Sequence, residues 1–153
     1  MRAVATTAVL LALAGCGHDE GIVPAGAATV QDPALSEMSG LVASRTQAGV
    51  LWAINDSGSV SRLFRLGPDG RALGRVALDG PWLEDPESLT RWFDGRTDWL
   101  LVADIGDNRA NRDTVVVHAV AEPAAGAADA RKAWTQLFRY PDGARDAEAE
   151  DVR

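Results

Sequence analysis

The chain has 153 residues, with 15 Lys and Arg against 22 Asp and Glu and a formal net charge of −7. This acidic balance argues against nucleic acid as a partner, because binding to phosphates depends on basic side chains that displace counterions. Cys16 is the only cysteine, so a disulfide within the chain is excluded.

The first residues predict a secretion signal. Arg2 precedes an apolar run at 8–14, which is too short to span a bilayer, since a spanning helix needs about 20 residues. The sequence LAGC at 13–16 matches the bacterial lipobox, in which the preceding peptide is removed and the thiol is lipidated. We therefore predict a signal peptide over 1–15, a lipidated Cys16, and a protein anchored to a membrane of the bacterial cell envelope, on its periplasmic or outer surface. An ordinary cleavage site with an incidental cysteine is the alternative.

Residues 16–34 are rich in Gly, Ala and Pro without a regular period, which is typical of a flexible tether. The globular domain is expected over 35–153. Its pattern of short apolar runs separated by turns predicts an all-β fold, with strands at 49–56, 61–66, 71–78, 98–105, 113–120 and 135–143. The segment at 126–134 is expected to be a loop with at most one helical turn.

The order of these elements repeats. An apolar strand, an Asp with a glycine-bearing turn, a polar connection and a second strand occur twice, and the interval from Asp56 to Asp107 is 107 − 56 = 51 residues. This spacing is typical of the four-stranded blades of a β-propeller. A β-sandwich with regularly spaced hairpins is the alternative.

Five segments resemble, in the same order, the motifs of a family of bacterial secreted or lipid-anchored β-propeller proteins related to the NHL and WD types. They are EMSGLVAS (37–44), LWAINDSG (51–58), DWLLVADIGDNRANR (98–112), AEP (121–123) and YPDGARDAEA (140–149). The resemblance implies a partial propeller of two to three blades of four-stranded antiparallel sheet. Family members are roughly twice as long, so the chain is expected to be truncated. No reaction is attached to the family as a whole.

The chain departs from the family before the strand that leads to DIGDN. Members carry an Asp-Trp-Glu-Asp type run there, whereas this chain has WLEDPESL at 82–89. The register of Glu84, Asp85 and Glu87 relative to the family therefore stays open.

Polar side chains at or just beyond strand ends are the site candidates. Loops at the ends of the innermost propeller strands converge near the axis, so oxygen ligands from several blades would meet there. Calcium needs six to eight such oxygens. The candidates for a metal or ligand site are Asn55, Asp56, Asp104, Asp107 and Asn108. The alternative is that these side chains cap tight turns by accepting backbone hydrogen bonds.

Charged residues near these candidates have separate expected roles. Arg109 and Arg112 are expected to form ion pairs with Asp104 and Asp107 within the loop, and binding of an anionic ligand is the alternative. Glu87 and Glu148 are candidate catalytic carboxylates. Glu148 forms an acidic end with Asp146 and Glu150, which would reach the propeller axis if the blade order holds, and a solvated tail is the favoured alternative for this end.

The remaining candidates are expected to be structural. His118 lies in an apolar run and is expected to be a packed or outward strand residue. The five tryptophans are expected to pack between blades.

Two functions fit this pattern. The first is an envelope lipoprotein with a noncatalytic binding module for a protein or small-molecule ligand. The second is a Ca²⁺-dependent hydrolase of phosphoesters or esters, with the metal polarising the substrate and Asp104 or Glu87 as base. The sequence favours the binding module and leaves enzymatic activity open.

Overall fold

A computed structural model describes residues 26–56, 60–80 and 82–148. They form eight strands: β1 (Met38–Ala43), β2 (Leu51–Asn55), β3 (Arg62–Leu66), β4 (Ala72–Asp79), β5 (Pro86–Phe93), β6 (Asp98–Asp104), β7 (Val115–Ala121) and β8 (Asp129–Phe138). Within these ranges the structure contains no helix, and hence none long and apolar enough to cross a membrane. The predicted lipidation site Cys16 and the predicted signal peptide lie outside the described residues.

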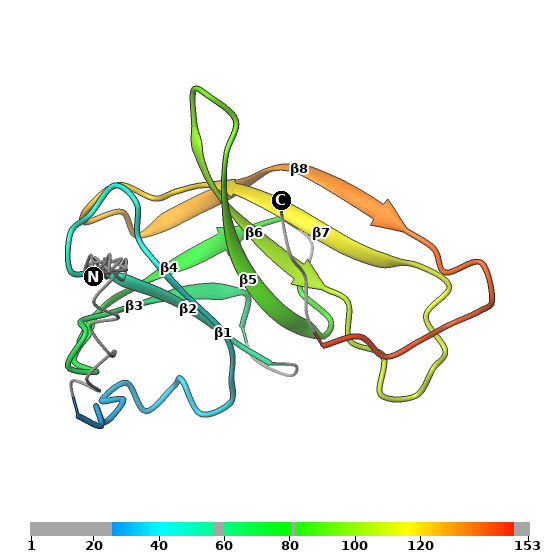
Figure 1. Cartoon of the computed structure of the whole chain (residues 1–153), viewed down its shortest axis with the longest axis horizontal. Coiled ribbons are helices and arrows are strands. Elements are labelled where there is room, and N and C mark those ends of the chain that lie inside the picture. The colour runs from blue at the N-terminus through cyan, green and yellow to red at the C-terminus, as the bar shows by residue number, and fades with distance from the viewer. Residues whose placement is uncertain (1–25, 57–59, 81, 149–153) are drawn as a thin grey trace, which may run out of the picture.

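The strands form one sheet with the order β1-β2-β3-β4-β8-β7-β6-β5 (Figure 1). It consists of two antiparallel four-stranded meanders, β1–β4 and β5–β8. A short parallel pairing of β4 with β8 joins them, in which residues 77–79 lie opposite residues 129–131.

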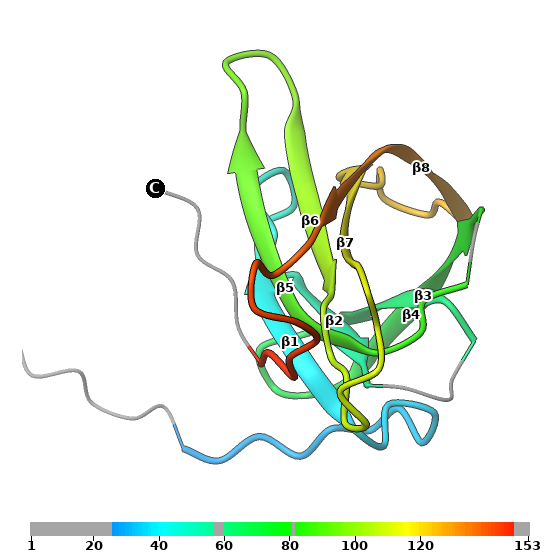
Figure 2. The same cartoon turned by 90° about the vertical axis from the view of Figure 1, so that its right-hand side faces the viewer.

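The sheet curls round until its two edge strands, β1 and β5, lie side by side (Figure 2). The approach is close at Gly40, where an added Cβ would lie 2.6 Å from the backbone nitrogen of Leu89. Ser39 Oγ also donates a hydrogen bond to the carbonyl of Pro86 (2.6 Å). This contact places the start of β5 beside the residues at the end of β2, because β1 pairs with β2.

The core lies inside the curled sheet and draws on both meanders. Its largest fully buried members include Trp52, Ile54, Leu63, Leu100 and Val102. Burial of such side chains stabilises the fold by about 1.5 to 3 kcal/mol each.

Two chain segments cover the outer face of the sheet. Val30 and Ala34, within the predicted tether, pack against a cluster that contains Phe64. Tyr140 and Ala147 pack in the same way on a cluster around Ile105, Ala103 and Val115. The second contact fixes the position of the C-terminal segment, which carries Asp146 and Glu148.

The prediction of an all-β protein is confirmed, whereas the prediction of two to three propeller blades is wrong. Propeller blades are separate sheets that pack face to face, but here the two meanders share one sheet. The difference arises from β8, whose first residues, Asp129 to Arg131, pair with β4 and join the meanders edge to edge. The prediction of a loop at 126–134 is wrong for the same reason, because β8 begins at Asp129.

The tryptophans do not pack between blades. Trp52 is fully buried in the core, whereas Trp82 is 69% exposed. Trp92 and Trp134 meet edge to face on the sheet surface, with ring centroids 6.5 Å apart. His118 is a packed strand residue, as predicted, and its Nδ1 lies 2.8 Å from Thr135 Oγ1.

Candidate functional site

Three carboxylates from distant parts of the chain meet where β5 begins. Asp85 precedes β5, Glu87 is its second residue, and Asp56 follows β2. One carboxylate oxygen from each lies within 4.8 Å of the other two, a spacing that fits a metal ion. Asp85 and Glu87 are both buried, with only 8% of each residue exposed. The contact between β1 and β5 creates this group, because it brings the end of β2 to the start of β5.

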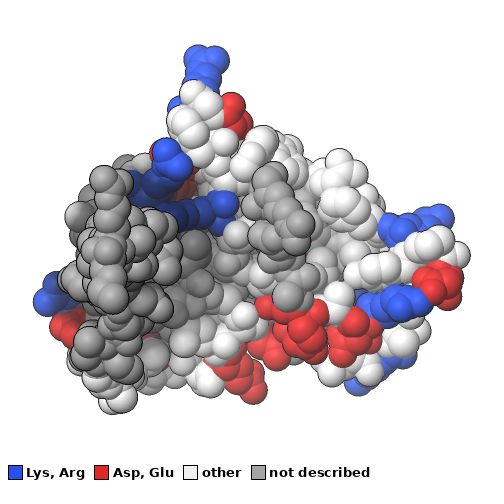
Figure 3. Space-filling view, in the orientation of Figure 1, with Lys and Arg blue, Asp and Glu red and all other residues white. Residues whose placement is uncertain are grey.

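A second group extends the first toward solvent, and the two groups together are called the cluster: Asp56, Asp85, Glu87, Asp146 and Glu148. Glu87, Asp146 and Glu148 also bring one carboxylate oxygen each within 4.8 Å of the others, and the last two residues are exposed. The backbone N–H of Asp107 donates to Asp146 Oδ1 (2.7 Å) and so holds the C-terminal segment at the site. In Figure 3, acidic side chains gather along the lower margin of the molecule, near the place where this segment passes the ends of β5 and β6 in Figure 1.

Gly106 leaves the space that the inner carboxylates occupy. A Cβ at this position would lie 2.5 Å from Asp85 Cγ and 2.5 Å from Glu87 Oε1. Its N–H donates to the carbonyl of Asp85 (3.0 Å). The glycine of the DIGDN segment is therefore required by close packing against the two acids.

The inner carboxylates are unfavourably placed for negative charge. Burial raises the pKa of Asp85, neighbouring Asp56 raises it further, and the hydrogen bond from Asn108 acts against this. Burial, followed by the charges of Asp56, Glu148 and the other nearby acids, raises the pKa of Glu87 to about 7. Asp85 Oδ1 is buried and accepts no hydrogen bond from any described residue. Such a group is costly unless a proton or a cation satisfies it.

Asp104 has a structural role. Its two carboxylate oxygens accept the backbone N–H groups of Glu84 (2.8 Å) and Asp85 (3.0 Å), which fixes the chain that enters β5. Arg112 Nη1 lies 2.8 Å from Asp104 Oδ1 and also donates to the carbonyl of Gly106 (2.7 Å). Asp104 thus positions the residues of the site but does not join the cluster itself.

Asp107 caps the turn that follows β6. Its carboxylate accepts the N–H groups of Asn111 (2.9 Å) and Arg112 (2.8 Å). Burial alone would raise the pKa of Asp107, but these two hydrogen bonds lower it overall. Asn55 has a similar role at the end of β2, where its side chain accepts the N–H of Glu37 (3.3 Å) and donates to the carbonyl of Ala34 (2.7 Å).

The structure thus separates the residues that the sequence grouped together. Of the candidate metal or ligand residues, it brings Asp56 into the first group with Glu87, while the candidate catalytic residue Glu148 meets Glu87 in the second group. Asn108 Nδ2 contacts Asp85 Oδ2 (3.4 Å), and three others bind backbone groups: Asn55, Asp104 and Asp107. The expected pairing of Arg112 with Asp104 is present, whereas Arg109 is exposed and forms no ion pair within the described ranges.

Sequence reasoning did not include Asp85 among the candidate site residues, and it placed Asp146 only in an acidic end of the chain with Glu148 and Glu150. The segment WLEDPESL carries Asp85, and its three acids within four residues, 84–87, were the available signal. Asp146 stands two residues before Glu148 in the acidic C-terminal segment. Nothing in the sequence at either position indicates that its carboxylate lies close to that of Glu87.

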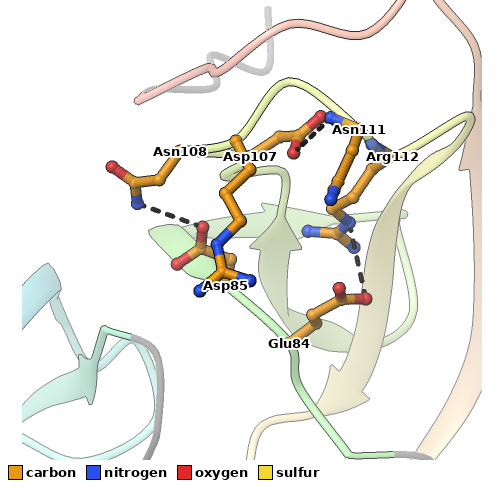
Figure 4. A pocket seen from close by; sticks show the side chains of 7 residues that line it. Glu84, Asp85, Asp107, Asn108, Asn111 and Arg112 are labelled. Atoms are coloured by element: carbon orange, nitrogen blue, oxygen red, sulfur yellow. Dashed lines mark hydrogen bonds and ion pairs between the residues drawn. The ribbon is translucent and has the colours of Figure 1, made fainter.

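A pocket of about 420 Å³ opens beside the cluster (Figure 4). Its lining comes from the chain before β5 and from the loop between β6 and β7, and comprises Glu84, Asp85, Asp107, Asn108, Arg109, Asn111 and Arg112. Asp85 belongs to both the pocket and the cluster, so a ligand in the pocket would approach any ion held there.

Comparison of the chain with family models, with curated proteins and with solved structures gave no match.

Proposed function

We propose that the protein is an envelope lipoprotein whose β-sheet domain is a noncatalytic binding module that requires a divalent cation, with Ca²⁺ the best candidate. The observation that carries this proposal is the buried Asp85 Oδ1, which accepts no hydrogen bond from the described residues and lies among other carboxylates. Anchoring through a lipid on Cys16 is part of the same proposal.

A cation resolves the electrostatic conflict within the cluster. Three carboxylates at this spacing repel one another, and two of them are largely removed from water. Their buried charge is tolerated only when it is protonated, paired or bound to metal. A divalent cation would neutralise most of the charge and bind the otherwise unsatisfied oxygen of Asp85.

The donor set fits Ca²⁺ better than Mg²⁺. Calcium accepts six to eight oxygen ligands in flexible geometry, whereas Mg²⁺ demands a near-ideal octahedron and keeps several waters. The inner acids are joined by Asp146 and Glu148 from an exposed segment, which offers additional carboxylate oxygens. The number of oxygens and their mixture of buried and exposed positions support the larger ion.

The test is a calorimetric titration of the purified full chain with Ca²⁺ after treatment with a chelator, and with Mg²⁺ in parallel. We expect Ca²⁺ to bind and Asp85→Asn to weaken binding at least tenfold, because the amide removes a charge while keeping the shape. Asp113→Asn is the control, since Asp113 is exposed and outside the cluster. Extracellular Ca²⁺ modules have Kd values of about 10⁻⁴ to 10⁻³ M, so absence of binding at about 10 mM would overturn the proposal.

A Ca²⁺-dependent hydrolase is the second candidate, and the pocket of about 420 Å³ beside the cluster favours it, because a substrate there would lie next to the cation. Turnover of p-nitrophenyl phosphate or p-nitrophenyl acetate that requires Ca²⁺ and is lost in Glu87→Gln would support the enzyme. Binding of Ca²⁺ without turnover of either compound supports the noncatalytic module.

A further inference from the structure

The pocket beside the carboxylate cluster differs from it in chemistry. Whereas the cluster consists of acids, the loop between β6 and β7 contributes two arginines and two asparagines to the pocket wall. In Figure 4, Asn108 lies on one side, Asn111 and Arg112 lie on the other, and Asp85 lies between them. The pocket therefore places hydrogen-bond donors next to the proposed cation.

Apart from Asp85 Oδ1, which the proposed cation would bind, most acceptor oxygens in this wall already have a partner. Both oxygens of Asp107 accept backbone N–H groups from the same loop. Asp85 Oδ2 receives Asn108 Nδ2 at 3.4 Å. Glu84, whose side chain is 71% exposed, lies 3.6 Å from the guanidinium of Arg112, which offsets its charge.

The two arginines differ in whether their guanidinium N–H donors already have partners. The side chain of Arg112 is 9% exposed and is engaged with Asp104 and with the carbonyl of Gly106. Arg109 is exposed, and its guanidinium has no ion pair or hydrogen bond with the residues that the structure describes. The side-chain amide of Asn111 likewise makes no hydrogen bond within those residues. The remaining donors in the pocket are therefore Arg109 and Asn111.

We propose that this pocket binds an oxyanion, the phosphate or carboxylate group of a small ligand, between the cation and Arg109. This inference rests on the proposed function. A cation at Asp85 would lie beside the pocket, because Asp85 also lines it, and such a cation prefers oxygen ligands. Arginine binds the paired oxygens of phosphate and carboxylate with parallel N–H donors. A single oxyanion could therefore bind the cation through one oxygen and Arg109 through the others.

The same geometry makes anion binding depend on the cation. Without it, Asp85 and its neighbours present negative charge to the pocket, and a second anion would be repelled. With it, two of these negative charges are offset and Arg109 adds a positive group, so the repulsion of an anion is weaker. The ligand and the cation should therefore bind with positive coupling.

The experiment titrates the full chain with phenyl phosphate and with benzoate, which share a ring and differ in the oxyanion. Each titration is run at saturating Ca²⁺ and again in EDTA. We expect at least one probe to bind with Ca²⁺ and its affinity to fall at least tenfold in EDTA. Binding by phenyl phosphate alone assigns the pocket to phosphate ligands, and binding by benzoate alone assigns it to carboxylates.

Arg109→Ala tests the pocket itself, and Arg96→Ala is the matched control. Arg96 is also an exposed loop arginine, in the turn between β5 and β6. At saturating Ca²⁺, we expect Arg109→Ala to weaken anion binding at least tenfold, about the effect of losing one charge-assisted hydrogen bond, and Arg96→Ala to leave it unchanged. Failure of both probes on the Ca²⁺-loaded chain overturns the inference while the proposed function stands. Failure of Ca²⁺ itself to bind overturns both.

Discussion

Asn55 and Asp104 occupy equivalent positions in the two meanders, and each side chain holds the chain segment that leads into its own meander. Asn55 ends β2 opposite Met38, Asp104 ends β6 opposite Pro86, and in both hairpins the register shifts directly after that pair. The structural repeat is therefore 104 − 55 = 49 residues, two fewer than the interval between Asp56 and Asp107 that the sequence suggested.

Asp104→Asn should destabilise the fold more than Asn55→Ala. The first change removes the ion pair with Arg112, and the new amide NH₂ group replaces one of the two oxygens that accept backbone N–H groups. The second removes two hydrogen bonds between uncharged groups, with the carbonyl of Ala34 and the N–H of Glu37. We expect losses of about 3 to 5 and about 1 to 3 kcal/mol in the free energy of unfolding, measured by urea denaturation. Asp113→Asn is the control, and equal losses for the two variants would contradict the proposed difference.

Strands with long apolar runs were predictable from sequence, and those that depend on distant contacts were not. The sequences at β2, β6 and β7 are dominated by Leu, Val, Ile and Ala, so their positions were predicted within a few residues. β1 and β5 mix small, polar and charged residues and become strands through their neighbours. β8 begins with residues that favour helix, and its pairing with β4 and β7 outweighs that preference.

The candidate site could be predicted only in part for the same reason. The position of Asp56 at a strand end is visible in the sequence, but its contact with Asp85 depends on the packing of β1 against β5. Asp104 and Asp107 stand at equally favourable positions, yet nearby N–H groups occupy their oxygens. A strand end predicts a polar residue without showing whether it faces a ligand or the backbone.

Glu122, in the AEP segment at 121–123, has a structural role. We expect Glu122→Gln to lower the free energy of unfolding at pH 7 by about 1 to 3 kcal/mol. Its carboxylate accepts Trp52 Nε1 (3.0 Å), the N–H of Arg45 (3.2 Å) and the hydroxyl of Ser44, which ties β7 to the first meander. Burial alone would raise the pKa of Glu122, but these hydrogen bonds lower it overall. The stability it contributes is therefore present above the unfolded-state pKa and lost as pH falls through the folded-state pKa.

Urea denaturation between pH 3 and 7 checks this role. The difference between the wild-type chain and Glu122→Gln should shrink as the pH falls. Glu37→Gln is the control, because Glu37 is exposed and uses its backbone N–H in the described contact with Asn55. A difference that stays constant with pH would show that the charge of Glu122 has no part in it.

Gly106→Ala should weaken Ca²⁺ binding and destabilise the fold by about 1 to 3 kcal/mol, the usual cost of overpacking. The added methyl group would displace Asp85 and Glu87, which are buried and closely surrounded. Gly67→Ala is the matched control, since the atoms its Cβ would meet belong to the exposed side chains of Asp69 and Arg71, which can move. Equal Ca²⁺ affinity for Gly106→Ala and the wild type, in a calorimetric titration, would exclude this steric coupling.

Cys16→Ser should release the protein from the membrane. Labelled palmitate supplied to an expressing bacterium should appear in the wild-type chain and be absent from the variant, because Cys16 is the only thiol. The wild type should sediment with membranes, since several acyl chains together give stable anchoring. A Cys16→Ser chain that still sediments with membranes would show that another part of the sequence attaches it.

Glu87 should make both stability and Ca²⁺ binding depend on pH, in opposite directions. Its pKa of about 7 in the folded chain lies above its ordinary value of 4.5, because burial and the nearby acids disfavour its charge. In the absence of cation, the stability it contributes is complete below about pH 4.5 and is lost as the pH rises through 7. At about 1.4 kcal/mol for each pKa unit, the loss is of order 3 kcal/mol. Calcium needs the carboxylate, so its affinity should rise over the same range.

Glu87→Gln separates this effect from other titrating groups. The amide mimics the protonated acid, so without Ca²⁺ the variant should be more stable than the wild type at pH 8 and about equally stable at pH 5. Its Ca²⁺ affinity should be low and nearly constant between these pH values. Calorimetry in buffers of different ionisation enthalpy should show that Glu87 in the wild type releases close to one proton on binding Ca²⁺ at pH 6 and almost none at pH 8. If Glu87→Gln is instead less stable than the wild type at pH 8 without cation, the carboxylate forms a favourable contact there and the predicted conflict between stability and binding is wrong.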